Sequence, residues 1–523
     1  MRLNFSIITD THIRDPKGDL SSPFPVNNKS NERAKFANEI LKISNSKFII
    51  HLGDMVHPLP QMDSYKNAVI EAKNIFKDLI HKINFVPGNH DIGDKPSKFV
   101  PAKPFTNESN IKYEKEYGKS YYSKVYENIL FIFINSSLIN SKHKEEKKQK
   151  IWLEKLLKKE KNRRKFLFSH YPPYIFSPDE DDHYDNYAEP GRSWLLELAN
   201  KNKVEAIFSG HVHHFFYNVY KNVRLYCLLP TSFTRQDYSE IFPISPENEY
   251  GRDDFGKFGI TNVEISENDH KIIVIPTFGK QLNEDKFKKN EYENLLSKNV
   301  KLSLIPHLKH SWFSPKYLPY NGPMEEFSRK IVRNDYPVLR LIQLGIKKFR
   351  TPFSDLINFT SYQRMQDLNK IGFKFNLFKI GFTNSKETKL IIKNTKLISN
   401  IEVLTSKLDM SDLSPNKLFL SNIKFYLSYI DSSANQINKK KVFSHSVSSG
   451  FPISEKNIVF KNFISMKFPK NTGIMFQLRW EENISLLKDL IKNGKKFKIP
   501  IKVNLRLSDS NPAISNFNEK KIK

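Results

Sequence analysis

Short runs of apolar residues recur through the first half of the chain, and five of them stop abruptly at a cluster of polar residues. The runs are rich in Ile, Val and Phe, and stretches with helical spacing separate most of them. A continuous apolar run of this length predicts a central strand of a sheet that is covered on both faces. The five predicted strands are residues 3–9, 48–52, 83–86, 166–168 and 204–208.

Helices and hairpins are predicted between and after these strands. Two strand-like runs around a short polar turn predict a hairpin at 120–136, and similar patterns follow at 215–229 and 259–276. Helical spacing predicts helices at 31–44, 63–82, 145–162 and 192–202. The order of these elements predicts an α/β fold for residues 1–280, in which two mixed sheets form a sandwich with helices outside.

The pattern of apolar and polar residues changes from about residue 327. Helix-then-strand units recur there, which indicates parallel β/α units. The pairs are 327–344 with 346–350, 362–370 with 373–380, and 386–399 with 401–404, and later apolar runs lie at 423–430, 442–447, 474–480 and 497–507. We therefore expect a second α/β domain at 327–523 that resembles a partial or irregular (β/α) barrel. A polar, lysine-rich stretch at 281–326 is the expected linker.

The five apolar runs of the first region end at motifs that can supply metal ligands. Loops at the carboxyl ends of neighbouring strands converge on one crevice in α/β folds, so we expect these motifs to meet. Asp and Asn offer oxygen and neutral His offers nitrogen, a mixture that suits Mn, Fe or Zn better than Ca or Mg. The motifs are Asp10-Thr11-His12, Gly53-Asp54-Met55-Val56-His57, Gly88-Asn89-His90-Asp91, Ser169-His170-Tyr171 and Gly210-His211-Val212-His213.

Each motif also has a purely structural interpretation. Asp10 fits the cap of a turn, and Asp54 follows a glycine as in many turns. A single buried histidine such as His170 is more often a hydrogen-bonded core residue than a ligand. The order of all five motifs, each at the end of a predicted strand, favours one metal site over five unrelated turns.

With these motifs in this order, residues 1 to about 280 resemble the calcineurin-like metallophosphoesterase superfamily. Within it, the likeness is to the class III cyclic nucleotide phosphodiesterases and the purple acid phosphatases. The resemblance implies a four-layer αββα sandwich and two divalent metal ions, Mn, Fe or Zn. The implied metal ligands are Asp10, His12 and His213 for one ion, Asn89, His170 and His211 for the second, and Asp54 as the bridge between them.

Two neighbouring residues are the implied catalytic pair. His90 matches the histidine of this family that contacts the scissile phosphate without binding metal, and Asp91 is expected to fix its tautomer. His57 stands where many relatives carry another polar residue, and we expect it to lie near the ligands or on the surface rather than bind metal. The colour-giving tyrosine ligand of purple acid phosphatases is absent, because Thr11 occupies the middle of the first motif.

These assignments predict a hydrolase of small phosphodiesters or phosphomonoesters, with diesters preferred. In such a site a water or hydroxide shared by two ions attacks phosphorus, and the ions neutralise charge on the phosphoryl oxygens. Arg235 and Arg252, in a predicted long loop at 230–258, are candidates for a phosphate contact, although an ordinary surface position is favoured for both. Two alternatives stay open: a catalytically weak metal-binding or regulatory protein whose C-terminal domain binds a ligand, and a nuclease.

The net charge of +28 raises the question of nucleic acid. Lysine is spread along the whole chain, and the densest basic run, 142–165, has the spacing of a solvated helix face. The loop that follows His170 is acidic and would repel a polyphosphate backbone. The balance favours a small phosphoester substrate over nucleic acid.

Cysteine usage and hydropathy suggest the compartment. The single cysteine, Cys227, rules out an intrachain disulfide and suits a reducing environment. No apolar run approaches the length of a membrane span, and no signal-like segment precedes the first predicted strand. We expect a cytoplasmic protein without a membrane segment, and the sequence predicts neither its oligomeric state nor its particular substrate.

Overall fold

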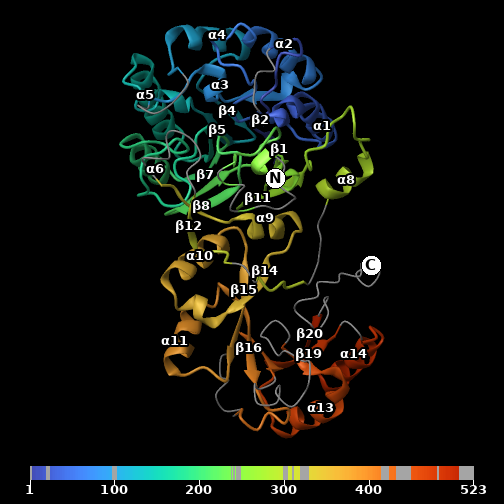
Figure 1. Ribbon diagram of the computed structural model, residues 1–523. Helices are drawn as coiled ribbons and strands as arrows, with labels where there is room; N and C mark the ends of the chain where they lie inside the picture. The colour runs from blue at the N-terminus through green and yellow to red at the C-terminus, as the bar shows by residue number, and fades with distance from the viewer. Residues whose placement is uncertain are drawn as a thin grey trace. The chain divides into compact units, whose positions relative to one another are not determined.

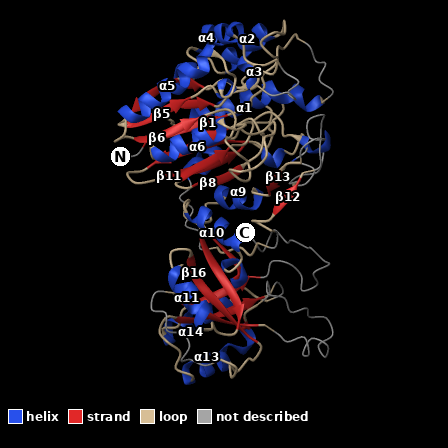
Figure 2. Ribbon diagram, turned by 90° about the vertical axis from the view of Figure 1, so that its left-hand side faces the viewer, coloured by secondary structure: helices blue, strands red, loops and turns tan. Residues whose placement is uncertain are grey.

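The chain folds into layered sheets and helices (Figure 1, Figure 2). In this computed structural model the described residues are 3–18, 24–96, 103–236, 238, 242, 249–297, 304–308, 311–318, 329–413, 423–430, 449–479 and 482–505. Within them, no helix combines the length and the apolar character that a bilayer span requires.

The chain divides into two compact units. Unit 1 comprises Met1–Lys301 and Ser311–Gly345, and unit 2 comprises Leu302–His310 and Ile346–Lys523. The division therefore falls later than the expected boundary at residue 327, because the segment before residue 346 packs with unit 1. In that segment the Arg333 guanidinium donates to the Tyr217 carbonyl, and the Asp335 carboxylate accepts from the Tyr217 amide, each at 3.0 Å. Independent folding of the two units stays a prediction.

The first sheet of unit 1 is mixed, in the order β11-β10-β1-β2-β3. Its strands are β1 (Leu3–Ile8), β2 (Ile49–His51), β3 (Ile83–Phe85), β10 (Gly259–Ile265) and β11 (His270–Pro276). β1, β2 and β3 run parallel, so their carboxyl ends lie at one edge. β10 and β11 form the predicted hairpin and pair antiparallel on the other side of β1.

The second sheet is also mixed, in the order β4-β5-β6-β7-β9-β8. Its strands are β4 (Tyr122–Tyr126), β5 (Ile129–Phe133), β6 (Arg164–Phe168), β7 (Val204–Ser209), β8 (Phe216–Tyr220) and β9 (Val223–Cys227). β5, β6, β7 and β9 are parallel, and β4 and β8 pair antiparallel at the edges. The predicted hairpin turn is confirmed at Glu127 and Asn128, whose φ angles of 47° and 69° fit a two-residue hairpin turn with both central residues left-handed.

An aromatic layer fills the space between the two sheets. The buried ring of Phe5 on β1 contacts Phe131, Phe168 and Phe208 of the opposite sheet edge-on, at centroid distances of 5.4, 6.0 and 6.5 Å. Such edge-to-face pairs add to the free energy gained from burying aromatic area. This aromatic packing fixes the positions of β1, β6 and β7 relative to one another.

Helices cover the outer faces of both sheets, which completes the predicted four-layer sandwich. Apolar residues of the two helices on the first sheet and of the two on the second join the core clusters beneath them. These helices are α1 (Ser30–Ile43), α2 (Tyr65–Ile75), α5 (Lys144–Lys159) and α6 (Gly191–Lys201). Three of them lie within three residues of the predicted ranges, whereas α2 ends at Ile75 and not at residue 82 as predicted.

Other elements of unit 1 depart from the predictions. The helix expected at 327–344 is shorter and follows a strand, because Pro337 in its first turn can begin a helix but not continue one. The expected linker at 281–326 also contains a helix and a short strand. The remaining elements are η1 (Pro25–Lys29), η2 (Ile80–Lys82), α3 (Asn89–Ile92), α4 (Asn107–Tyr117), η3 (Ser136–Leu138), η4 (Glu249–Gly251), η5 (Phe255–Lys257), α8 (Lys289–Ser297), β12 (Pro315–Tyr317), β13 (Ile331–Arg333) and α9 (Tyr336–Gln343).

Unit 2 is built on a sheet in which every described strand pair is parallel. The main order is β14-β15-β16-β17-β19, and both β18 and β20 pair with β19. The strands are β14 (Lys348–Pro352), β15 (Lys374–Ile380), β16 (Ile398–Thr405), β17 (Lys424–Tyr429), β18 (Phe451–Pro452), β19 (Thr472–Leu478) and β20 (Ile501–Leu505). The order follows the sequence, as in a β/α barrel, but no pairing joins β14 to β20 within the described residues. The barrel-like form stays a prediction.

The helices of unit 2 extend further along the chain than the sequence pattern indicated. They are η6 (Phe353–Leu356), α10 (Phe359–Asn369), α11 (Ser385–Lys393), η9 (Ile453–Glu455), α13 (Lys456–Ser465) and α14 (Leu486–Phe497). Sequence reasoning missed α13 and α14, which lie among the later apolar runs. The strand predicted at 442–447 lies outside the described residues.

Candidate metal centre

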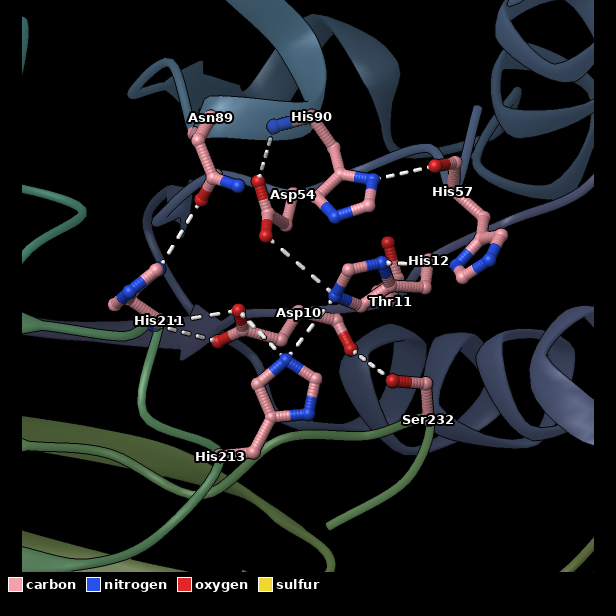
Figure 3. A network of polar contacts seen from close by, with 12 residues as sticks. Asp10, Thr11, His12, Asp54, His57, Asn89, His90, His211, His213 and Ser232 are labelled. Atoms are coloured by element: carbon pink, nitrogen blue, oxygen red, sulfur yellow. Dashed lines mark hydrogen bonds and ion pairs between the residues drawn. The ribbon is translucent and has the colours of Figure 1, made fainter. Parts of the chain in front are cut away.

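Five strand ends of unit 1 bring the motif residues to one place, at the carboxyl edge of both sheets. Figure 3 shows residues of four of the five motifs around Asp54. This convergence is what the parallel arrangement of β1, β2 and β3 opposite β6 and β7 predicts. Asp10 and His12 follow β1, Asp54 follows β2, Asn89 and His90 open α3 after β3, His170 follows β6, and His211 and His213 follow β7.

Four buried side chains form the first group of potential ligands. Asp10, His12, Asp54 and His213 each offer an atom, and these atoms lie within 4.8 Å of one another. The Nε2 atoms of His12 and His213 face each other at 3.1 Å. His12 Nε2 lies 3.5 Å from Asp54 Oδ2, and His213 Nε2 lies 3.3 Å from Asp10 Oδ1. Two carboxylates and two imidazoles therefore converge on one point.

A second group lies on the other side of Asp54. Asp54, His170 and His211 also offer atoms within 4.8 Å of one another. The His170 Nε2 atom is 3.4 Å from Asp54 Oδ1 and 3.1 Å from the Asn89 side-chain oxygen. The same Asn89 oxygen lies 3.1 Å from His211 Nδ1. Asp54 thus presents Oδ2 to the first group and Oδ1 to the second.

Hydrogen bonds orient two of these imidazoles. The Nδ1–H of His170 donates to the Leu52 carbonyl at 2.8 Å, and the Nδ1–H of His213 donates to the Phe233 carbonyl at 2.6 Å. A carbonyl can only accept, so in a neutral ring these bonds leave Nε2 with its lone pair directed at the centre. This is the arrangement of a histidine metal ligand whose other nitrogen is held by the protein.

The electrostatics of the centre also fit a bound cation. Burial lowers the pKa of His12 well below its ordinary value, which favours the neutral, metal-binding form of the ring. Burial opposes the charge on Asp54, yet His170 and His90 hold the pKa of this carboxyl well below its usual range. A buried anionic carboxylate between groups of facing nitrogen atoms suits a divalent ion on each side. The donor set therefore fits two metal ions.

The backbone at the centre is constrained in an unusual way. Left-handed φ angles are uncommon for residues other than glycine, and they cluster at functional sites where the surrounding structure imposes them. Five of the seven predicted metal ligands have such angles. They are Asp10 (51°), His12 (43°), Asp54 (51°), His211 (68°) and His213 (59°).

Two glycines allow the strand ends to approach closely. Gly53 has a φ of 101°, and a Cβ there would lie 2.6 Å from His170 Nδ1. At Gly210 a Cβ would lie 2.1 Å from Thr9 Oγ1 and 2.7 Å from Asp10 Oδ2. Thr9 Oγ1 also donates to Asp10 Oδ2 at 2.7 Å. Gly210 therefore leaves room for the hydrogen bond that positions Asp10.

Replacing Gly210 by alanine should weaken metal binding, because the new methyl group must displace Thr9 or Asp10. Loss of a group that orients a ligand typically costs about 10–100-fold in metal affinity. The metal content of the purified variant, measured after dialysis against a weak chelator, checks this. Gly118→Ala is the control for backbone strain away from the centre: its φ of 88° disfavours alanine, but nothing lies within 4 Å of the new Cβ, so this variant should keep its metal. Equal metal retention by wild type and Gly210→Ala would show that this approach does not position Asp10.

The structure separates the predicted roles of His90 and Asp91. The His90 Nδ1–H donates to the backbone carbonyl of His57, and its ring lies 4.7 Å from the His12 ring. The Asp91 carboxylate instead accepts from the backbone amides of Met55 at 3.0 Å and Gly88 at 2.9 Å. The expected role of Asp91 in fixing the His90 tautomer is therefore wrong. Asp91 ties the second and third motif loops together, and the His57 carbonyl fixes the His90 ring.

The remaining predicted candidates lie around the centre. The half-buried His57 ring has its Nδ1 3.4 Å from His12 Nδ1, and burial with nearby His90 lowers its pKa to about 3. Arg235 forms an ion pair with Asp185. Arg252 lies over the Phe233 ring, 4.6 Å from its centroid, and the same ring packs against His12. Neither arginine has the plain surface position that the sequence favoured.

Sequence reasoning missed a buried carboxylate beside the second group. Asp185 is fully buried, and its Oδ1 lies 3.6 Å from His211 Nε2, which is beyond hydrogen-bond distance. It accepts from Lys330 Nζ at 2.6 Å and from the Tyr238 hydroxyl at 2.7 Å, in addition to Arg235. The acidic loop after His170 gave no signal that one of its carboxylates points inward. Tyr184 was missed as well; its hydroxyl accepts from the Asn89 amide at 3.3 Å.

The αββα sandwich and the convergence of Asp, Asn and His side chains at the sheet edges are features of metallophosphoesterases. Residues 3–215 match the family described as calcineurin-like phosphoesterase. This part of the chain belongs to the calcineurin-like metallophosphoesterase superfamily.

Curated relatives match part of the chain. The serine/threonine-protein phosphatase CPPED1 of Danio rerio is 30% identical over 175 residues, which cover 32% of this chain and 54% of that protein. The chain thus spans about half the length of that relative. A probable glycerophosphodiester phosphodiesterase, GpdQ, of Arcobacter nitrofigilis is 27% identical over 218 residues, 39% of this chain and 70% of that protein.

The solved structures that match are more distant in sequence. The purple acid phosphatase PPD1 from yellow lupin seeds is 16% identical with a TM-score of 0.37, over 54% of this chain and 52% of that one. The GAP50 protein of Plasmodium is 15% identical with a TM-score of 0.35, over 58% of this chain and 98% of that one.

Proposed function

We propose that unit 1 is a dinuclear-metal hydrolase of phosphoester bonds, with small phosphodiesters as preferred substrates and phosphomonoesters as the alternative. The observation that carries the proposal is the position of Asp54, whose two carboxylate oxygens face two separate groups of ligand atoms. A carboxylate shared in this way is typical of sites that clamp the attacking and leaving oxygens of a phosphoryl group.

Seven side chains would hold the ions. When bound, two divalent ions supply an activated water and neutralise charge on the phosphoryl oxygens. The first ion would be held by Asp10, His12, Asp54 and His213, and the second by Asp54, Asn89, His170 and His211.

His90 is the proposed catalytic residue that does not bind metal. Its Nδ1–H is taken by the His57 carbonyl, and its backbone amide donates to Asp54 Oδ1 at 2.8 Å. The ring is therefore fixed beside the centre with Nε2 left for substrate. To donate from Nε2 the ring must be an imidazolium, because the neutral ring carries its one proton on Nδ1. In that form it would give a hydrogen bond or a proton to the departing oxygen.

The charges beside the centre support the preference for diesters. Arg235 and Lys330 both form ion pairs with the buried Asp185, which lies beside the second group. These ion pairs therefore largely neutralise the positive charges of Arg235 and Lys330. A diester carries one negative charge and a monoester two, so the diester needs less additional positive charge. The relatives include a protein named as a phosphatase and one named as a phosphodiesterase, which supports phosphoester hydrolysis without deciding between them.

Metal removal gives the direct test of this function. The chain should contain two equivalents of Mn, Fe or Zn, and chelation should abolish hydrolysis of bis(4-nitrophenyl) phosphate, with recovery when metal returns. 4-Nitrophenyl phosphate tested in parallel measures the preference between diester and monoester. Two bound metals without turnover of either ester would favour the alternative of a regulatory metal-binding protein.

A further inference from the structure

Unit 2 has polar and charged side chains concentrated on one face of its parallel sheet. Successive side chains of a strand point to opposite faces, so the pairing register shows which residues share a face. Arg350 on β14 pairs with Asn376 on β15, and Glu402 on β16 pairs with Tyr426 on β17. Following the register through β19 places Lys502 of β20 on the same face. The opposite face is apolar and packs against helices.

The polar face is concave. Three strands separate β15 from β20 in the order β15-β16-β17-β19-β20, which would put them about 19 Å apart in a flat sheet at about 4.8 Å per strand. Yet Lys502 Nζ donates to the Asn376 side-chain oxygen at 3.0 Å. The Asn504 side-chain amide, also on β20, donates to the Ser449 carbonyl at 2.9 Å. The sheet therefore curves around these side chains.

A fully buried ion pair forms the floor of this concave face. The Arg350 guanidinium donates to both carboxylate oxygens of Glu402, at 2.6 and 3.0 Å, and both residues are buried. The Ser449 hydroxyl donates to the same carboxylate at 2.6 Å, and Arg350 Nη1 lies 3.1 Å from His307 Nδ1. This bidentate geometry is the strong form of an ion pair, and it uses the Nε and Nη2 edge of the guanidinium. The pair is therefore a fixed scaffold.

Positive charge remains in excess around Lys502. Its Nζ lies 4.3 Å from the centroid of the Tyr426 ring. Burial is the largest influence on its pKa, which falls to about 7, and the charged groups that act on it are one carboxylate and three cations: Glu402, Lys348, Arg350 and Lys424. Glu402 neutralises Arg350, so Lys348 and Lys424 are the remaining cations around Lys502. This excess attracts an anion, whose charge would in turn favour the protonated form of Lys502.

Two buried polar atoms on the same face lack a partner. Ser428 Oγ and Asn400 Oδ1 form no hydrogen bond within the described part of the chain, and both residues are buried. Their strand register places them on the face that carries Glu402 and Tyr426. A buried polar group without a partner costs free energy, so such groups commonly mark the position of a bound molecule. The Ser428 hydroxyl can donate to an anion, whereas Asn400 Oδ1 is an acceptor and would pair only with a protonated oxygen of the bound molecule.

We propose that the concave face of unit 2 binds a phosphate group, either as inorganic phosphate or as the monoester of a small molecule. Lys502 is the cationic contact, and Asn376 and Ser428 supply neutral donors from other directions. A tetrahedral anion can accept from such separate directions. A planar carboxylate is best matched by an arginine fork, and the Arg350 fork is already occupied by Glu402.

Site-specific labelling of Lys502 tests this proposal in the full, metal-loaded chain. Because the extent of labelling is measured at Lys502 alone, phosphate bound in unit 1 does not contribute to the result. Amines are modified with acetic anhydride at pH 7.5, and the extent at each lysine is measured by peptide mass spectrometry. Phosphate at ten times its Kd should reduce labelling of Lys502 about tenfold, because about one site in eleven stays free. Chloride at equal ionic strength should have no effect.

Lys379 is the internal control. It lies on the opposite face of the same sheet, and its Nζ donates to Glu387 at 2.7 Å, so its labelling should not respond to phosphate. Glycerol 3-phosphate, tested in parallel, distinguishes the two sources: protection at lower concentration than inorganic phosphate identifies a monoester ligand, and the reverse order identifies free phosphate. Absence of protection by both compounds, or equal protection of Lys379, would overturn the proposal.

Two variants provide a second test of the proposed site. Phosphate should raise the Tm of the wild-type chain by more than that of Lys502→Met, since a ligand that binds only the folded state stabilises it by RT ln(1 + [L]/Kd), and the variant has the higher Kd. Ser428→Ala removes one neutral donor with little change of volume and should weaken protection of Lys502 several-fold. If Ser428→Ala and wild type show the same protection, the hydroxyl is not part of the site and the proposed donor set is wrong.

Discussion

Asp54→Asn should lose bound metal and catalytic turnover together. The substitution preserves the shape of the side chain, and the amide oxygen can keep the hydrogen bond from the His90 amide at Oδ1. The amide nitrogen would then replace Oδ2, which faces His12, and it has no lone pair available for a cation. We expect the metal content to fall below two per chain and kcat to fall by at least about 10²-fold, the usual cost of losing one preorganised electrostatic contact.

Metal analysis and kinetics on the same sample measure both effects. Asp78→Asn is the matched control, because its carboxylate is 55% exposed and lies outside the centre. This control should keep both metals and full turnover. An Asp54→Asn protein with two metals and near-normal turnover would show that Asp54 does not bridge.

His90→Ala should keep both metals and lose about 10²–10⁴-fold in turnover on substrates with poor leaving groups, the usual range for a general acid or base. His90 lies beside the centre, but a backbone carbonyl, rather than a metal ligand, orients its ring. An alkoxide leaving group needs a proton, whereas 4-nitrophenolate leaves without one. The loss should therefore be much smaller for nitrophenyl esters than for alkyl diesters.

His57→Ala is the informative comparison for His90. That substitution removes the imidazole but keeps the backbone carbonyl that holds His90, so it should leave the leaving-group dependence unchanged. Equal losses on both substrate types in His90→Ala would indicate that His90 only positions the substrate. Loss of metal in the same variant would indicate a structural role.

The sequence predicted the sandwich well because its strands and their ends have a simple pattern. Buried parallel strands require continuous apolar runs, and the polar motifs interrupt those runs where the sheets end. The same pattern indicates that Asp54, His170 and His211 meet at one edge, and their side chains do lie together there. Their assignment as metal ligands stays a prediction, although the described geometry fits it.

Contacts made by the backbone were beyond the reach of sequence reasoning. Asp91 was expected to bind the His90 ring because the two residues are adjacent, but its carboxylate bonds to the amides of Met55 and Gly88. The carbonyl that holds His90 belongs to His57, and no side-chain pattern indicates which carbonyl will point inward. Hydrogen bonds of this kind depend on loop conformation and carry no compositional signal.

The burial of charged residues that lie far apart in the chain could not be predicted from the sequence either. Asp185 lies in a run of acidic residues that suggested a solvated loop, yet it is fully buried with Arg235 and Lys330. Lys330 is 145 residues away in the chain. The same distance explains why the sequence did not indicate that the segment containing Lys330, which follows residue 327, packs with unit 1. Only the folded chain shows which distant cation neutralises a buried carboxylate.

Anomalous diffraction from crystals grown with Mn tests the central claim most directly. We expect two anomalous peaks per chain, one on each side of the Asp54 carboxylate and about 3.5–4 Å apart, as in other two-metal sites. One peak should lie among Asp10, His12 and His213, and the other among Asn89, His170 and His211. A single peak, or two peaks that do not flank Asp54, would contradict the dinuclear centre.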